Sequence, residues 1–160
     1  MATHKFENVA KLDSGDGIGI ARKKGNILDT LEASGVLALN DVVIVGRVPV
    51  DGKLPSLKLF CDDLGTAGTV NIGFHKISGK NDLGAAIDAD ALATAVDVNA
   101  AALAGVDQAF EVRDIATLAD KMWELAGLSA RPAFDEMFLT MTIAEATTAG
   151  GTIGVHGIIE

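Results

Sequence analysis

The side chains best suited to chemistry are one cysteine and three histidines. Cys61 is followed by Asp62 and Asp63, whose negative charges oppose thiolate formation and so disfavour a nucleophilic role. His75 and His156 each fall in a predicted strand and could meet across a sheet, but no further metal ligands stand at a recognisable spacing. We interpret Cys61 as a half-buried structural residue and the histidines as solvated or hydrogen-bonded strand residues.

Carboxylates and glycines offer three further kinds of site, and each falls short. Acid–base catalysis needs two carboxylates at a defined separation in a cleft, whereas turn and cap positions explain every close pair in this chain. The loop around Asp88 lacks the spacing of a calcium loop, and residues 15–19 (GDGIG) lack the preceding strand and full glycine spacing of a phosphate-binding loop. The sequence therefore predicts no enzyme, no metal and no cofactor. The pairs are Asp13/Asp16, Asp62/Asp63, Asp88/Asp90 and Asp135/Glu136.

The chain is both apolar and acidic, with 160 residues, a mean hydropathy of +0.33 and a net charge of −9. Residues 1–25 carry five basic and three acidic side chains (+2), and residues 26–160 carry eight basic and 19 acidic ones (−11). An acidic body disfavours nucleic acid as a partner. No apolar run is long enough for a membrane span, and the first residues lack a signal peptide's apolar region, so we expect synthesis in the cytoplasm without secretion.

Strand patterns dominate from residue 36 onward. Residues 42–45 are β-branched, and residues 56–60 and 69–77 alternate, which predicts a three-stranded antiparallel meander over residues 41–78. Two further strands are predicted at 137–143 and 152–159. The predicted fold class is mainly β: an antiparallel, jelly-roll-like β-sandwich with one amphipathic helix and an extended N-terminal arm.

Two segments interrupt this strand pattern. The Ala-rich stretch 79–109 is predicted as an insertion with one or two helical turns. Residues 114–126 carry an apolar stripe at helical spacing, with Asp114 as N-cap and Gly127 just past the last turn, and so predict the clearest helix. The predicted domain spans residues 36–160.

Residues 1–35 are predicted to form an arm that is partly extended and gains order from a partner. A short helix over residues 27–34 is one possibility within it. An ordinary solvated leader is the alternative that the residues leave open. The predicted partner contacts combine basic and apolar side chains: Lys5, Phe6, Ile18, Ile20, Arg22, Lys23 and Lys24.

Several segments resemble those of a known group of proteins. They are residues 40–49 (NDVVIVGRVP), 57–65 (LKLFCDDLG), 70–74 (VNIGF) and, later, 114–115 (DI) and 123–129 (WELAGLS). Over residues 36–160 the chain resembles small virion structural proteins of tailed bacteriophages, of the head decoration (cement) type.

The resemblance implies a non-enzymatic protein on the outer capsid surface. It implies the major capsid protein and further copies of itself as partners, with a trimer favoured. Two alternatives stay open: another virion component, such as a head–tail connector, tail or spike protein, and a jelly-roll ligand-binding module.

Overall fold

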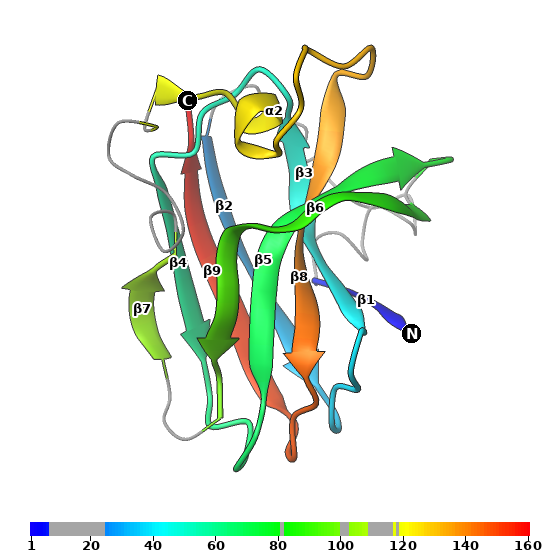
Figure 1. The fold of residues 1–160 in the computed structure, drawn as a ribbon. Coiled ribbons are helices and arrows are strands. Elements are labelled where there is room, and N and C mark those ends of the chain that lie inside the picture. The colour runs from blue at the N-terminus through cyan, green and yellow to red at the C-terminus, as the bar shows by residue number, and fades with distance from the viewer. Residues whose placement is uncertain (7–24, 81, 100–102, 109–116, 118) are drawn as a thin grey trace.

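The computed structural model describes residues 1–6, 25–80, 82–99, 103–108, 117 and 119–160 (Figure 1). The described strands form a five-stranded sheet of order β1-β3-β8-β5-β6 and a four-stranded sheet of order β2-β9-β4-β7. None of the described helices is long and apolar enough to cross a membrane. The elements are β1 (Thr3–Lys5), β2 (Gly25–Ala33), β3 (Val42–Pro49), β4 (Ser56–Cys61), β5 (Thr69–Ser78), β6 (Asp82–Asp97), β7 (Leu103–Asp107), α2 (Met122–Leu125), β8 (Glu136–Glu145) and β9 (Gly151–Ile159).

The strand pairing is that of one long hairpin wrapped around a core. Antiparallel pairs nest outward from β5 with β6, through β4 with β7 and β3 with β8, to β2 with β9. Folding this hairpin over places alternate pairs in opposite sheets, which is the jelly-roll arrangement. The predicted fold class is confirmed, with one addition: β1 joins β3 in parallel at the edge of the five-stranded sheet.

The predicted meander over residues 41–78 is wrong. β3 and β5 both pair with β8 in one sheet, whereas β4 pairs with β7 and β9 in the other. Alternation along a strand reports which face is buried and carries no information about the partner strand. The predicted turn at residues 51–52 is present, because Gly52 N donates to Pro49 O at 3.1 Å, but it leads across to the other sheet.

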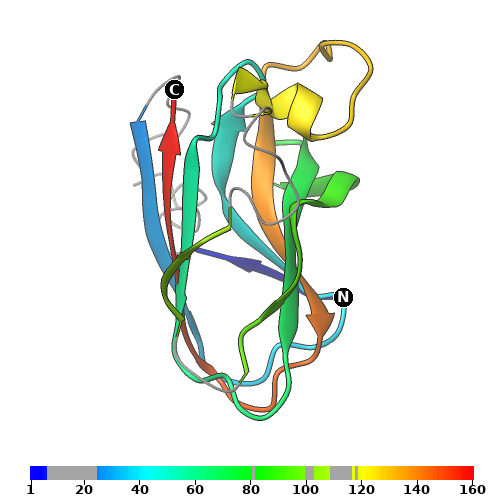
Figure 2. The same ribbon diagram turned by 60° about the vertical axis from the view of Figure 1, so that its left-hand side comes forward.

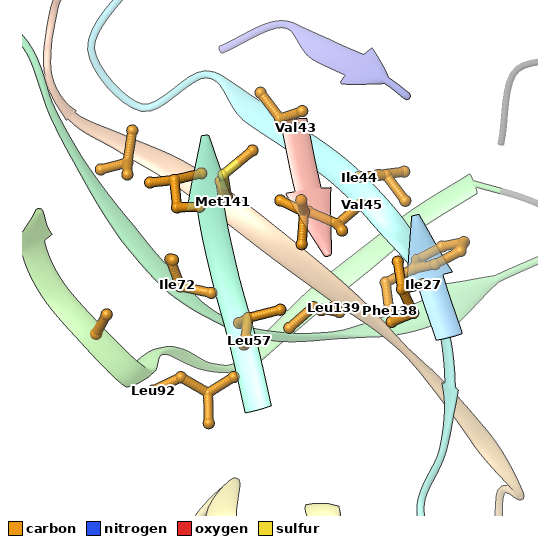
Figure 3. Packing of buried hydrophobic residues seen from close by; sticks show 14 of the residues in the cluster. Ile27, Val43, Ile44, Val45, Leu57, Ile72, Leu92, Phe138, Leu139 and Met141 are labelled. Carbon is orange, nitrogen blue, oxygen red and sulfur yellow. The ribbon is translucent and has the colours of Figure 1, made fainter. Parts of the chain in front are cut away.

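The core lies between the two sheets, as Figure 3 shows for Leu57 of β4 among Ile72, Leu139 and Met141 of the facing sheet. The alternation predicted for β4 is confirmed, because Leu57 and Leu59 are buried while Lys58 and Phe60 are exposed. Residues 42–46 and 137–141 are buried without interruption, so both faces of these central strands are covered.

The short helix considered over residues 27–34 is not formed. These residues fall largely in β2, which pairs with β9 along its whole length and agrees with the prediction of a partly extended segment. The Ala-rich stretch forms β6 and β7, because pairing with β5 and β4 outweighs the helix propensity of alanine.

β6 is irregular and crosses the front of its sheet in Figure 1. At the crossing its backbone at Asp88 and Ala89 lies directly against Gly73 of β5. Nearby, Asn71 Oδ1 accepts a hydrogen bond from Ala95 N at 2.8 Å, and Ala95 has a left-handed φ of +52°. The register shifts between β5 and β6 are thus fixed by particular close contacts.

The predicted helix over residues 114–126 is seen only in part, because residues 109–116 and 118, with the proposed cap Asp114, lie outside the described residues. α2 begins after Lys121, whose N–H donates to Glu124 Oε2 at 2.7 Å. Gly127 follows it with φ +69°, as predicted for the residue past the last turn. The helix is held on the β3–β4 connection, since Met122 N donates to Gly52 O at 2.8 Å.

Candidate functional site

The amino-terminal strand and the edge of β3 that receives it are the main candidate interaction site. β1 pairs with β3 in register Thr3 with Val42, His4 with Val43 and Lys5 with Ile44. Main-chain hydrogen bonds extend this pairing at both ends, from Val42 N to Ala2 O at 3.0 Å and from Phe6 N to Ile44 O at 3.1 Å. In Figure 2, β1 (blue) runs across the side of the sandwich. The segment therefore closes one open edge of the fold.

Asp41 fixes the start of this strand pair. Its carboxylate accepts hydrogen bonds from Ala2 N at 2.5 Å and from Ala38 N at 3.1 Å, and it lies 3.4 Å from His4 Nε2. The hydrogen bond from Ala2 is the main reason that the pKa of Asp41 is lowered, and those from Ala38 and His4 act in the same direction. The charged carboxylate thus joins the first residues of the chain to the β2–β3 turn.

The predicted partner contacts divide into two groups. Lys5 is half-buried in β1, and Phe6 is fully buried in the core. Ile18, Ile20, Arg22, Lys23 and Lys24 lie outside the described residues.

The arm predicted for residues 1–35 is corrected where the structure describes it, because β1 and β2 are members of the two sheets. Phe6 contacts the core of the fold and is not displayed to solvent, since an aromatic side chain gains most from full burial. The basic and apolar types at positions 5 and 6 did not distinguish a free arm from an edge strand.

Exposed large apolar side chains form two groups. The turn group consists of Met1, next to Ala2, and of Val36 and Leu39 on the β2–β3 connection, and these residues are 83%, 60% and 55% exposed. The sheet-face group consists of Leu28, Phe60 and Ile158, which are 71%, 39% and 38% exposed on strands β2, β4 and β9. Sequence patterns could place Phe60 on an exposed face, but they gave no sign that strands so distant in sequence would place the three on one outer face.

Register explains how the sheet-face group assembles. Leu28 lies opposite His156, which in turn lies opposite Lys58. Phe60 lies opposite Gly154 one row away, and Ile158 lies opposite Ser56 in the row on the other side. The ring of Phe60 lies over Gly105 of β7, where an added Cβ would come within 2.7 Å of Phe60 Cε1. Phe60 as a whole stays 39% exposed, so part of it is accessible to a partner.

Cys61 and His75 are buried within the fold. Cys61 is buried at 6% exposure, as a structural residue should be. His75 and His156 do not meet, because β5 and β9 belong to different sheets. His75 Nδ1 lies 2.9 Å from Thr140 Oγ1, which itself donates to Gly73 O at 3.3 Å. His75 is thus a hydrogen-bonded strand residue, and burial lowers its pKa.

The close carboxylate pairs that the structure describes accept hydrogen bonds in turns or form ion pairs with arginines. Asp62 Oδ2 accepts from Thr152 N at 2.9 Å, and Asp63 Oδ1 accepts from Gly65 N at 2.8 Å. Asp135 pairs with Arg131 at 2.8 Å, while Glu136 pairs with Arg47 at 3.3 Å. Burial is the main cause that raises the pKa of Asp88. Within the described part of the chain, no three His, Cys, Asp or Glu side chains gather as a metal site would require.

Comparison with known proteins gives matches in structure alone. No family model matches the sequence, and no curated protein matches it. A chain from the solved capsid of Ralstonia phage GP4 superposes with a TM-score of 0.65 and 19% identity, covering 99% of this chain and 97% of that one. A chain from the capsid asymmetric unit of cyanophage Pam1 superposes with a TM-score of 0.52 and 16% identity, covering 89% and 88%. At these identities the likeness establishes a shared fold.

Proposed function

We propose that this chain is a non-enzymatic structural component of a bacteriophage head and that it acts there as a decoration (cement) protein. The observation that carries the proposal is the match to a chain of a phage capsid over 99% of this chain and 97% of that chain. A jelly roll serves many unrelated functions, so the fold alone would not suffice. The sequence resemblance over residues 36–160 supports the same conclusion.

A decoration protein stabilises a shell because it binds only the assembled state, so its binding free energy adds to that of the shell. Many copies reinforce one another even when each contact is modest. In this proposal the partners are the major capsid protein and further copies of the chain, with a trimer favoured, on the outer surface of the virion. The two exposed apolar groups supply contact surface that a monomer leaves in water.

The experiment that tests the proposal is protein quantification in purified particles from the genome that encodes this chain. We expect a copy number comparable to that of the main shell subunit, and particles lacking the chain should break at a lower temperature. A single ring of copies at one vertex would instead indicate a connector or tail role. Complete absence of the chain from particles would overturn the proposal.

A surface variant links the test to this structure. Leu28→Ser removes the most exposed side chain of the sheet-face group, and Thr30→Ser is the control on the same strand and the same exposed face. Because Leu28 is 71% exposed, its loss should leave the folded monomer stable. We expect Leu28→Ser to lower occupancy on particles and Thr30→Ser to leave it unchanged.

A further inference from the structure

The β1 dock is the edge of β3 together with the turn at Asp41. It is stabilised by parts of the chain other than β1. Asn40 N donates to Ile143 O at 2.8 Å, and Ile143 N donates to Asp41 O at 2.9 Å. These two main-chain hydrogen bonds fix the turn at Asp41 to β8. Leu37 N and Thr147 Oγ1 add a buried hydrogen bond of 2.8 Å between the β2–β3 and β8–β9 connections. The receiving edge of β3 is therefore preformed, and any strand with the right side chains could add to it.

Residues 2–6 carry the groups that the described part of the dock contacts. Ala2 supplies the N–H for Asp41, His4 supplies the imidazole beside it, and Phe6 fills the core at 0% exposure. None of these contacts depends on which copy of the chain provides the segment. A second copy therefore presents a ligand identical to the one already bound.

The connection between the segment and the rest of its chain permits such an exchange. The eighteen residues 7–24 separate Phe6 from β2, and a chain of that length spans up to ~60 Å when extended. Because the segment is tethered to its own dock, it has a local concentration there that a neighbouring copy must match. Exchange between copies becomes competitive when neighbours approach that local concentration, as they would in a shell lattice.

The surface beside the dock favours another copy as occupant. The turn group, Met1, Val36 and Leu39, lies on the two segments that Asp41 joins, the chain start and the β2–β3 connection, and is more than half exposed. An entering strand only replaces the chain's own Met1. The apolar surface that a neighbouring copy would cover here is therefore that of Val36 and Leu39, which one copy leaves in water.

We propose that, at high local concentration, residues 2–6 of one copy add to β3 of a neighbouring copy, so that decoration proteins are linked by exchanged amino-terminal strands. This deepens the proposed head function and rests on it for the source of crowding. Exchange of an identical element needs no new interface and is a low-cost route to linked copies.

Disulfide trapping tests the exchange in a Cys61→Ala background. One chain carries Thr3→Cys and the other carries Val42→Cys, because these residues are partners in the strand register and Val42 is otherwise inaccessible at 0% exposure. Val70→Cys, at 1% exposure and outside this register, is the matched control partner. The double variant Thr3→Cys/Val42→Cys reports closure within one chain.

The two chains are mixed after unfolding and refolding, then oxidised across a series from micromolar to several millimolar. We expect the disulfide between a Thr3→Cys chain and a Val42→Cys chain to increase with concentration. Its yield should exceed that between a Thr3→Cys chain and a Val70→Cys chain at least tenfold. An interchain yield that stays at the control level, with the double variant closing only within its chain, would overturn the exchange.

The same oxidation on decorated particles separates the two proposals. If particles contain many copies of the chain but disulfides form only within single chains, the exchange is refuted and the head function stands. Interchain product in concentrated solution, with no chain on particles, would refute the head function and leave the exchange intact.

Discussion

Substitution of Gly73 by alanine tests the least expected feature of the fold, the passage of β6 across β5. A Cβ at position 73 would meet the backbone of Asp88 and Ala89, with Ala89 C at 2.5 Å and Ala89 O at 2.8 Å. Since both neighbours are backbone, no side-chain rotation relieves the overlap. Overpacking of this kind costs about 1–3 kcal/mol, which for a chain of this size lowers Tm by roughly 2–12 °C.

Gly46→Ala is the matched control. Gly46 is also buried in the five-stranded sheet, but the nearest atom to its added Cβ is Ile27 Cγ2 at 3.9 Å, an ordinary contact. There the reduced freedom of the unfolded chain should raise stability by about 0.4–1 kcal/mol. Thermal unfolding followed by circular dichroism compares the two. If Gly73→Ala is as stable as Gly46→Ala, β6 does not cross at Gly73 and the assigned β5–β6 register is refuted.

Three further predictions concern charge and backbone strain. Asp41→Asn should destabilise the β1 dock by about 1–3 kcal/mol, and faster amide exchange in residues 2–6 would show it by mass spectrometry; unchanged exchange contradicts the role of the carboxylate. Burial lowers the pKa of His75, so the unfolded chain binds the proton more readily and stability should fall as pH drops below about 6.5. Denaturant midpoints at pH 7.5 and 5 measure this loss, and His75→Gln should reduce it. Ala95→Gly should raise stability by up to ~1 kcal/mol, because it relieves a left-handed φ of +52°; a lower denaturant midpoint would contradict this.

The sequence predicted those strands whose burial alternates or whose residues are β-branched. Residues 42–45, 56–60 and 137–143 were assigned correctly because local preference and tertiary position agree there. β6 was missed because alanine favours a helix in isolation, and only pairing with β5 holds this stretch extended.

Strand pairing could not be predicted from local patterns. β2 and β9 pair from Gly25 with Ile159 to Ala33 with Gly151, across most of the chain. A turn signal such as residues 51–52 marks a change of direction without saying whether the next strand stays in the same sheet. The connections before and after β4 both cross to the other sheet, so the inference of a local meander fails at each of them.

The predicted partner contacts stay a prediction, and only Lys5 and Phe6 of them are among the described residues. Basic and apolar residues near the start of the chain indicated contact with a partner, and the first partner of Phe6 is the chain's own core. The decisive group, Asp41, gave no signal because an aspartate before a strand is an ordinary turn residue. Its importance appears only when the fold brings Ala2 and His4 to its carboxylate.

The apolar composition also takes a different meaning once burial is known. Much of the apolar content lies in strands such as β3 and β8, whose central residues are covered on both faces. High mean hydropathy by itself therefore does not argue for assembly, because the core accounts for it. The argument for assembly rests instead on the large apolar side chains that stay exposed among the described residues, and these lie near the β1 dock and on the outer face of β2, β9 and β4. If the dock joins copies to one another, the sheet-face group is the apolar surface left to contact the shell, and Leu28→Ser should then lower particle occupancy without reducing interchain trapping at Thr3 and Val42.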